Sequence, residues 1–235
     1  CESCHGPARE HVEHHRNPLT RYLGRLDPQA EPGIVHPGEM TAAASSQVCG
    51  QCHSITVFED DDAWVQHGHD AAPPEPIAEW GAVVRHPLRA DLPWTESLLD
   101  GDPDYFANRF WYDGMVRISG REYNGLIESP CASSEDFGCL SCHSMHGSDR
   151  VDQLDPVDED GACMACHPAI AEAGTAHTHH AEGSSGSRCV NCHMPHTTYG
   201  LLKAIRSHEI SSPNVAEDTA VGRPNACSLC HVEQT

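Results

Sequence analysis

The sequence is poor in basic residues and has no long apolar run. Lysine and arginine together number 14 against 35 acidic residues, which gives a formal net charge of -21. A nucleic-acid partner requires a basic surface, so this balance excludes nucleic-acid binding as the function. No stretch of about 18 consecutive apolar residues occurs, so we expect no transmembrane segment.

Apolar side chains are also in short supply. Aromatic residues make up 6% of the chain and hydrophobic residues 38%, which is little for the core of a protein of 235 residues. The acidic residues are dispersed among cysteine, histidine and short apolar runs, a pattern that argues against a disordered chain. We therefore expect that something other than side chains fills much of the interior.

Cysteine and histidine are abundant instead, with 13 and 19 residues. Six times the chain reads Cys, two residues, Cys, His. The motif cysteines are Cys1 and Cys4, Cys49 and Cys52, Cys139 and Cys142, Cys163 and Cys166, Cys189 and Cys192, and Cys227 and Cys230. The histidines that end the motifs are His5, His53, His143, His167, His193 and His231.

The histidine that follows each CxxC pair indicates which of three functions the pair has. Structural zinc sites and redox-active dithiols also use such pairs, but neither requires the histidine that follows. Attachment of haem c requires it every time, because two thiols add to the haem vinyl groups and the adjacent histidine binds the iron. The motifs therefore predict six haem c groups, whose porphyrins replace the missing core.

The remaining thirteen histidines supply candidates for the sixth iron ligand. His146 follows His143 too closely to reach the opposite face of the same haem, so we expect it to bind the iron of a neighbour. His208 lies in LLKAIRSHEI, whose apolar spacing indicates a helix that aims the histidine inward. His11 shares a predicted helical face with His14 and His15. The predicted distal ligands are His11, His146, His208 and, from the HTHH cluster, His177 and His180; the sixth is unassigned.

The spacing of the motifs divides the chain into three parts. We predict an N-terminal two-haem segment at residues 1–53, a haem-free insertion at 54–138 that contains all four tryptophans, and a C-terminal four-haem segment at 139–235. Within the insertion, RFWYDGMVRIS predicts a small β-hairpin around residues 109–119 with an Asp-Gly turn. With 17 prolines and 19 glycines, the predicted fold is mostly irregular with short α-helices around a haem core.

Several blocks resemble a known family. CVNCHMPHTTYGLLKAIRSHEI and GRPNACSLCH are similar to the C-terminal haem pair of the multihaem cytochromes c that carry a CHMP signature and a Pro-Asn-Ala-Cys final motif. CESCHGP, SGREYNGLIESPC and CLSCHSMHG resemble the first and middle parts of that group. The resemblance implies that His208, His146 and a histidine among His177 to His180 are distal ligands. Members of this group commonly continue into helical repeats, so we expect a fragment or a processed form.

These features predict electron transfer through closely tethered, mostly bis-histidine haems. Predicted partners are redox proteins or an extracellular acceptor, and a homo-oligomer or conducting filament with haem contacts between subunits extends this hypothesis. The alternative is a nitrite- or hydroxylamine-converting oxidoreductase with one open-coordinate haem. Related nitrite reductases use a proximal lysine at the catalytic haem, whereas all six motifs here end in histidine; hydroxylamine chemistry uses a histidine-ligated haem and stays open.

Two further expectations concern location and the last cysteine. Thioether attachment in bacteria and archaea takes place outside the cytoplasm, so we predict an exported protein that is periplasmic, extracellular or on the cell surface. Cys131 in ESPCASS has no CxxC partner. A small buried apolar role and an intermolecular disulfide both stay open for it.

Overall fold

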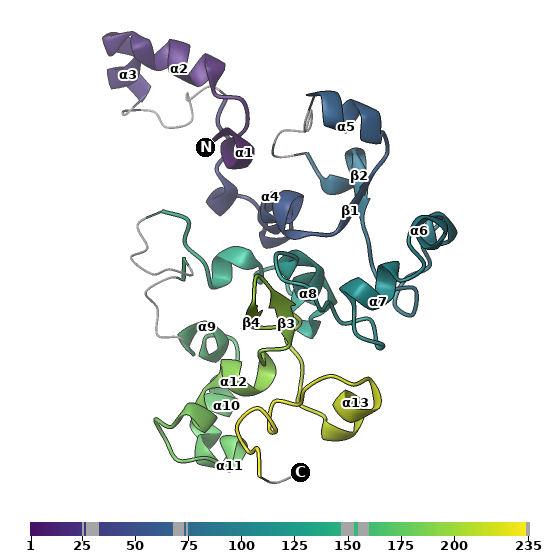
Figure 1. The fold of residues 1–235 in the computed structure, drawn as a ribbon. Coiled ribbons are helices and arrows are strands. Elements are labelled where there is room, and N and C mark those ends of the chain that lie inside the picture. Colours follow the sequence, from purple (N-terminus) through teal and green to yellow (C-terminus); the bar gives the residue numbers. More distant parts are fainter. Residues whose placement is uncertain are drawn as a thin grey trace.

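Short helices joined by irregular segments make up the fold. The computed structural model describes residues 1–24, 26, 33–67, 73, 75–146, 153, 154 and 160–233. The chain runs from the N-terminus and α1 (Glu2–His5) at one end of the molecule to the C-terminus at the other, with α4 (Ala42–His53) and α8 (Glu122–Glu128) packed together between them (Figure 1). Among the described residues, no helix has the length and apolar character needed to cross a membrane.

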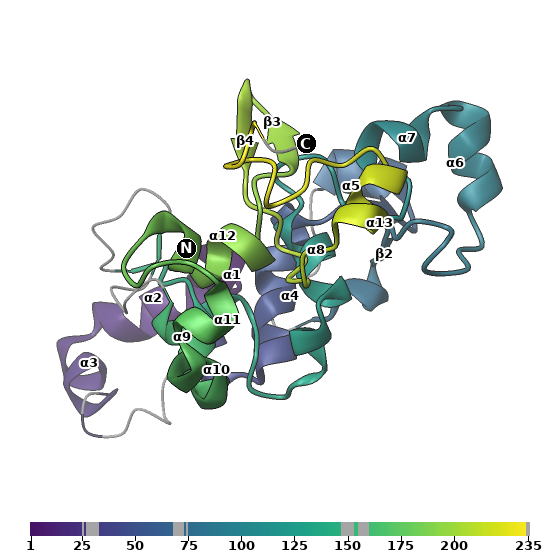
Figure 2. The same cartoon turned by 90° about the horizontal axis from the view of Figure 1, so that it is seen from below.

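The N-terminal segment is helical. After α1 come α2 (Arg9–Arg16) and α3 (Pro18–Gly24), which project away from the remaining helices in Figure 1; in Figure 2, α3 lies at the edge of the molecule. A short 3-10 helix at Pro37–Glu39 leads to α4, where the Thr41 hydroxyl accepts a hydrogen bond from the Ala44 N–H at 3.3 Å. This N-cap satisfies one of the free amides at the helix start. The second CxxCH motif forms the last turn of α4.

The insertion contains a strand pair and several short helices. Its elements are β1 (Thr56–Phe58), α5 (Asp61–His67), a 3-10 helix at Ile77–Glu79, β2 (Gly81–Val83), α6 (Thr95–Gly101), α7 (Tyr105–Arg109), α8 and a 3-10 helix at Pro130–Ser133. The β-branched run after His53 favours a strand. Accordingly β1 pairs antiparallel with β2, with Thr56 opposite Val83.

This insertion has an apolar core made of side chains. Ile55, Val84, Phe106, Phe110 and Val116 form a buried cluster, and Val84 is completely buried. Burial of such side chains stabilises a fold by about 1.5–3 kcal/mol each. The insertion is therefore stabilised in the conventional way, which the prediction of a mainly haem-filled interior did not include.

The C-terminal segment has short helices around its motifs and one strand pair. Its elements are a 3-10 helix at Cys139–Ser141, α9 (Gly161–Met164), α10 (Pro168–Ala173), α11 (Thr175–Thr178), a 3-10 helix at Ser185–Ser187, α12 (Cys189–His193), β3 (Thr198–Gly200), β4 (Lys203–Ile205) and α13 (Val215–Ala220). β3 and β4 pair antiparallel, with Thr198 opposite Ile205. The fold class is confirmed: short helices and irregular segments with small antiparallel strand pairs.

Two local predictions have different outcomes. Around residues 109–119 the chain does reverse, with a single antiparallel bridge between Phe110 and Val116 and Gly114 at a φ of 89°. The helix predicted for LLKAIRSHEI is wrong, because its first residues form the turn and second strand of the β3–β4 hairpin. Leu201 and Leu202 adopt positive φ angles of 50° and 61°, as the two central residues of a type I′ turn do.

Candidate haem-binding sites

The CxxCH motifs share one local conformation. In four of them a hydrogen bond from the histidine N–H to the carbonyl of the first cysteine is 2.8–3.0 Å long, joining for example His5 to Cys1 and His231 to Cys227. The other two motifs lie in α4 and α12. Residues at positions i, i+3 and i+4 of a helical turn lie on one face, so both thiols and the imidazole of each motif share a side. This is the arrangement that attachment of one haem requires.

Four proximal histidines each face a second imidazole from a distant part of the chain. His146 lies opposite His5, with ring centroids 5.9 Å apart and ring planes at 8°. His208 lies opposite His143 at 6.3 Å and 19°. The remaining two pairs are His177 with His193, at 6.1 Å and 4°, and His180 with His231, at 5.8 Å and 37°.

These separations fit one metal ion between each pair of rings. Two metal–nitrogen bonds of about 2 Å each, plus about 1 Å from each nitrogen to its ring centroid, separate two rings that bind one iron by about 6 Å. Direct contact between two imidazoles brings the rings closer, as in the tilted pair His11 and His15 at 4.4 Å and 52°. The four pairs therefore fit a bis-histidine haem iron.

Hydrogen bonds at Nδ1 orient several of these rings. Nδ1 of His5 lies 2.7 Å from the Val35 carbonyl, that of His193 lies 2.9 Å from the Ser211 carbonyl, and that of His180 lies 2.6 Å from the Thr178 carbonyl. A carbonyl can only accept, so Nδ1 carries the proton and Nε2 is left to bind a metal. Burial lowers the pKa of His208, which favours its neutral, metal-binding form.

His53 differs because its partner is a carboxylate. Its Nδ1 lies 2.6 Å from Oε2 of Glu122, at the start of α8. Burial by itself raises the pKa of Glu122, but hydrogen bonds from His53 and from two backbone amides together lower it to about 2. The same bond to Glu122 raises the pKa of His53. A charged acceptor on a proximal ligand increases the ligand's basicity.

Glycine lets the chain approach one predicted ligand closely. A Cβ atom on Gly186 would lie 2.2 Å from Cδ2 of His180, so no larger residue fits beside this ring. Gly186 belongs to the GSSGS loop that follows the HTHH cluster. This loop therefore packs directly against the imidazole that faces His231.

Other histidines occupy different settings. His36 lies 6.3 Å from His5 with its ring plane at 74°, and His5, His11 and His36 line one hollow with Cys1. His196 contacts the Ala204 carbonyl through Nδ1 at 3.1 Å.

His86 packs edge-on against Phe106 and Phe110, and its Nδ1 accepts a hydrogen bond from the Leu88 amide. In neutral His86 the proton therefore lies on Nε2, so this nitrogen has no lone pair with which to bind a metal.

Attachment cysteines of successive motifs are neighbours in space. A hydrogen bond joins the thiols of Cys49 and Cys139, raising the pKa of the first and lowering that of the second to about 7. Cys163 and Cys189 are joined in the same way. Cys4 lies near Cys49, Cys142 near Cys163, and Cys192 near both Cys227 and Cys230. The motifs therefore follow one another in space in their order along the chain.

Cys131 lies outside every motif, in the 3-10 helix at Pro130–Ser133. It is half-buried and close enough to Cys163 to raise the pKa of that thiol slightly. Its setting is compatible with the small apolar role, and neither of its two predicted roles is tested.

Comparison with known proteins adds an independent observation. Residues 150–232 match the family described as cytochrome c7 and related cytochrome c. Three of the six CxxCH motifs lie in that stretch, together with His177, His180 and His208. None of the curated proteins matches this sequence.

A solved structure resembles the entire chain. Outer cell wall cytochrome OcwA matches with a TM-score of 0.57 at 19% sequence identity, over 100% of this chain and 54% of that protein. The chain thus spans about half the length of OcwA. At this identity the likeness establishes that the two chains share a fold.

Sequence reasoning missed two contacts at these sites. Glu122 lies in SGREYNGLIE, far along the chain from His53, and nothing in its local sequence marks it as a ligand partner. His36 precedes Pro37 and Gly38, a setting that indicates a solvated histidine, yet it lies beside His5. In both cases the tertiary contact brings together residues that no spacing rule connects.

Proposed function

We propose that this protein transfers electrons along six covalently bound haem c groups, most of them with two axial histidines. The observation that carries the proposal is the set of four histidine pairs whose rings are 5.8–6.3 Å apart with ring planes at 37° or less, each containing one proximal histidine. His36 lies at a similar distance from His5, 6.3 Å, but with its ring plane at 74°. The order of the attachment cysteines supports a linear chain of redox centres. Haem, when bound, supplies a one-electron iron couple.

Each pair is assigned to one haem. His146 is the distal ligand opposite His5, His208 opposite His143, His177 opposite His193, and His180 opposite His231. The twelve motif cysteines form the thioethers. His11 remains a predicted ligand without an assigned partner, and the distal ligands at His53 and His167 are unassigned.

The protein's own residues keep these ligands in place. Carbonyl acceptors at Nδ1 hold His5, His193 and His180 and leave Nε2 available to bind the iron. His146 lies just beyond the third motif but faces the histidine of the first, and so links two sites. Bis-histidine ligation closes the iron to small molecules, which favours electron transfer over substrate turnover.

Spectroscopy of the haem-loaded protein tests the proposal. Mass spectrometry should give six haems per chain, and low-temperature electron paramagnetic resonance should show at least four low-spin irons. His146→Ala, His208→Ala, His177→Ala and His180→Ala should each convert one iron to high spin. His36→Ala is the matched control at the first site. If it opens that iron while His146→Ala does not, the assignment of His146 is wrong.

The alternative function is an oxidoreductase with one open-coordinate haem. His53 is the site for which a specific observation favours it, because Glu122 gives this proximal ligand an anionic partner. A stoichiometric high-spin iron in the wild-type protein, together with turnover of hydroxylamine or nitrite, would replace the conduit hypothesis. An entirely low-spin spectrum without turnover rejects the alternative.

Placement and partners complete the proposal. We place the protein outside the cytoplasm, where haem c is attached, as a periplasmic, extracellular or cell-surface carrier. A net charge of -21 favours cationic redox partners.

The first and last motifs lie near opposite ends of the molecule (Figure 1), as contact between haems of adjoining subunits in an oligomer or filament requires. Electron microscopy at high concentration distinguishes filaments from separate particles.

A further inference from the structure

The end of α8 binds the backbone that carries His208. The Ser129 hydroxyl donates to the His208 carbonyl at 3.0 Å and accepts from the Ile210 N–H at 2.9 Å. Ser129 is 4% exposed, so water does not compete for these bonds. One hydroxyl of the haem-free insertion thus fixes the chain on both sides of Glu209.

Gly125 allows the helix to lie directly on this segment. A Cβ atom at position 125 would lie 2.6 Å from the Glu209 nitrogen and 2.8 Å from the His208 carbonyl carbon. Both neighbours are backbone atoms, which cannot turn aside as a flexible side chain can. The backbone of α8 therefore defines how close the His208 segment lies to the insertion.

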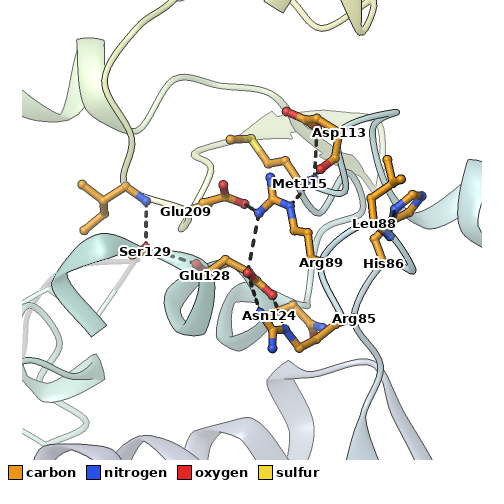
Figure 3. A network of polar contacts seen from close by, with 12 residues as sticks. Arg85, His86, Leu88, Arg89, Asp113, Met115, Asn124, Glu128, Ser129 and Glu209 are labelled. Atoms are coloured by element: carbon orange, nitrogen blue, oxygen red, sulfur yellow. Dashed lines mark hydrogen bonds and ion pairs between the residues drawn. The ribbon is translucent and has the colours of Figure 1, made fainter. Parts of the chain in front are cut away.

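Arg89 anchors the residue that follows His208. Its Nη1 donates to Oε2 of Glu209 at 2.8 Å and lies 3.7 Å from Oε2 of Glu128, while its Nε donates to the Asp113 carbonyl at 2.8 Å. Figure 3 shows Arg89 lying between Glu209 and Glu128. Glu209 is 8% exposed, so its carboxylate depends on Arg89 for a compensating charge.

We propose that Arg89, acting through Glu209, is a positioning residue that holds the His208 imidazole opposite His143, with Ser129 and Gly125 completing the support. This rests on the proposed assignment of His208 and His143 as the two axial ligands of one haem. Because Glu209 adjoins His208, releasing its carboxylate frees the backbone from which the imidazole extends. The insertion is therefore a ligand support for the third haem.

The test measures the spin state of the haem-loaded protein. Arg89→Leu should raise the open, high-spin fraction at one haem about tenfold, equivalent to about 1.4 kcal/mol. Added imidazole should restore the low-spin signal, and Arg89→Lys should retain most of it. Arg109→Leu is the matched control, since it removes a 3.1 Å ion pair to Asp102 within the same insertion but away from His208. It should leave all irons as in the wild type.

A reference variant separates the two claims. If His208→Ala leaves every iron low-spin, the axial assignment itself fails. If His208→Ala opens one iron and Arg89→Leu leaves the wild-type spectrum, the positioning role is overturned; equal opening by Arg109→Leu overturns it too. Should Arg89→Leu not fold, Glu209→Gln decides, because it removes the charge through which Arg89 acts: a high-spin fraction at this haem supports the role, and a wild-type spectrum rejects it.

Discussion

The insertion and the motif-bearing segments bury apolar surface in different ways. Of the nine buried hydrophobic residues among those that the structure describes, only Val48 and Ala226 lie outside residues 54–138. In contrast, three apolar residues inside CxxCH motifs, Leu140, Met164 and Leu229, are 36–42% exposed. One region thus folds around its own side chains, while the other presents apolar side chains where the predicted porphyrins attach.

The difference teaches that buried apolar side chains need not be spread evenly along a chain. A hydrophobic content of 38% coexists with a conventional small core in the insertion and with few buried apolar side chains in the described motif-bearing segments. The two regions are also coupled, because Trp111 Nε1 donates to the Thr197 carbonyl at 3.1 Å and Arg223 pairs with Asp113 at 2.5 Å. The insertion therefore has a core of its own and also contacts the segments that carry the CxxCH motifs.

Loss of one haem should give the largest effect. In the double variant Cys227→Ser and Cys230→Ser, we expect residues 189–233 to lose most of their protection in hydrogen-exchange mass spectrometry, because the haem proposed at the last motif would supply much of their contact surface. The insertion core around Phe110 should keep its protection. Cys131→Ser, which lies outside the motifs, is the control. Equal protection of both regions in the double variant contradicts the distinction drawn between them.

Removing a large side chain from the insertion core should give the next largest effect. Phe110 is 4% exposed, and Phe110→Ala should destabilise the insertion by about 3–5 kcal/mol through lost burial and a residual cavity. Tyr112→Ala, at a residue 76% exposed in the same turn, should change stability by about 0.5 kcal/mol or less. Denaturant unfolding followed by tryptophan fluorescence measures both, since all four tryptophans lie in the insertion. Similar values for the two variants count against a side-chain core.

Glu122→Gln tests a contact between the two regions, because Glu122 lies in the insertion and its partner His53 belongs to a motif-bearing segment. The change keeps the size of the side chain but removes the negative charge beside His53, so the oxidised iron is stabilised less. We expect the midpoint potential of one haem to rise by about 60 mV, a tenfold shift in a one-electron equilibrium. Spectroelectrochemistry measures the shift, with exposed Glu135→Gln as control. An unchanged titration curve means that the carboxylate does not influence the iron.

The smallest expected effect concerns acid stability. Although burial opposes it, hydrogen bonds from the Met115 amide and Arg223 lower the pKa of Asp113 below its ordinary value of 3.8. The ionised carboxylate therefore stabilises the folded protein above that value, and the contribution is lost as the pH falls through the folded pKa. Asp113→Asn should cost about 1 kcal/mol at pH 7 and progressively less below pH 4.

Urea titrations at several pH values check this expectation, with exposed Asp136→Asn as control. A cost for Asp113→Asn that is the same at pH 7 and at pH 3 indicates a steric effect. Such a result shows that the charge of Asp113 does not contribute to the contact between the insertion and Arg223.

The fold was predictable where local chemistry dominates. Proline, glycine and the CxxCH motifs indicated short helices and irregular segments, and the Asp-Gly pair indicated the chain reversal that Gly114 makes. The LLKAIRSHEI segment was not predictable from its apolar spacing, because hydrogen bonds between Tyr199 and the chain at Arg117 and Ser119 favour a hairpin there. Tertiary contacts outweighed the local pattern.

The candidate sites divide in a similar way. The spacing of His146 from His143 already predicted that His146 serves a neighbouring site, and its ring faces His5. The spacing did not indicate which neighbour, nor that His177 and His180 face different proximal histidines. Those pairings depend on how the turns after α11 and α12 pack, which no local motif encodes.

The sequence by itself determined which residues are predicted to attach haem, because each CxxCH motif holds its thiols and its histidine within five residues, without help from the rest of the chain. Only the tertiary structure decided which histidine lies opposite a proximal histidine. The partner of His5 comes from beyond the third motif, the partner of His143 from beyond the fifth, and the contacts of Arg89 with Glu209 join the insertion to the latter. Covalent attachment acts within five residues, whereas axial pairing requires distant segments to be held side by side.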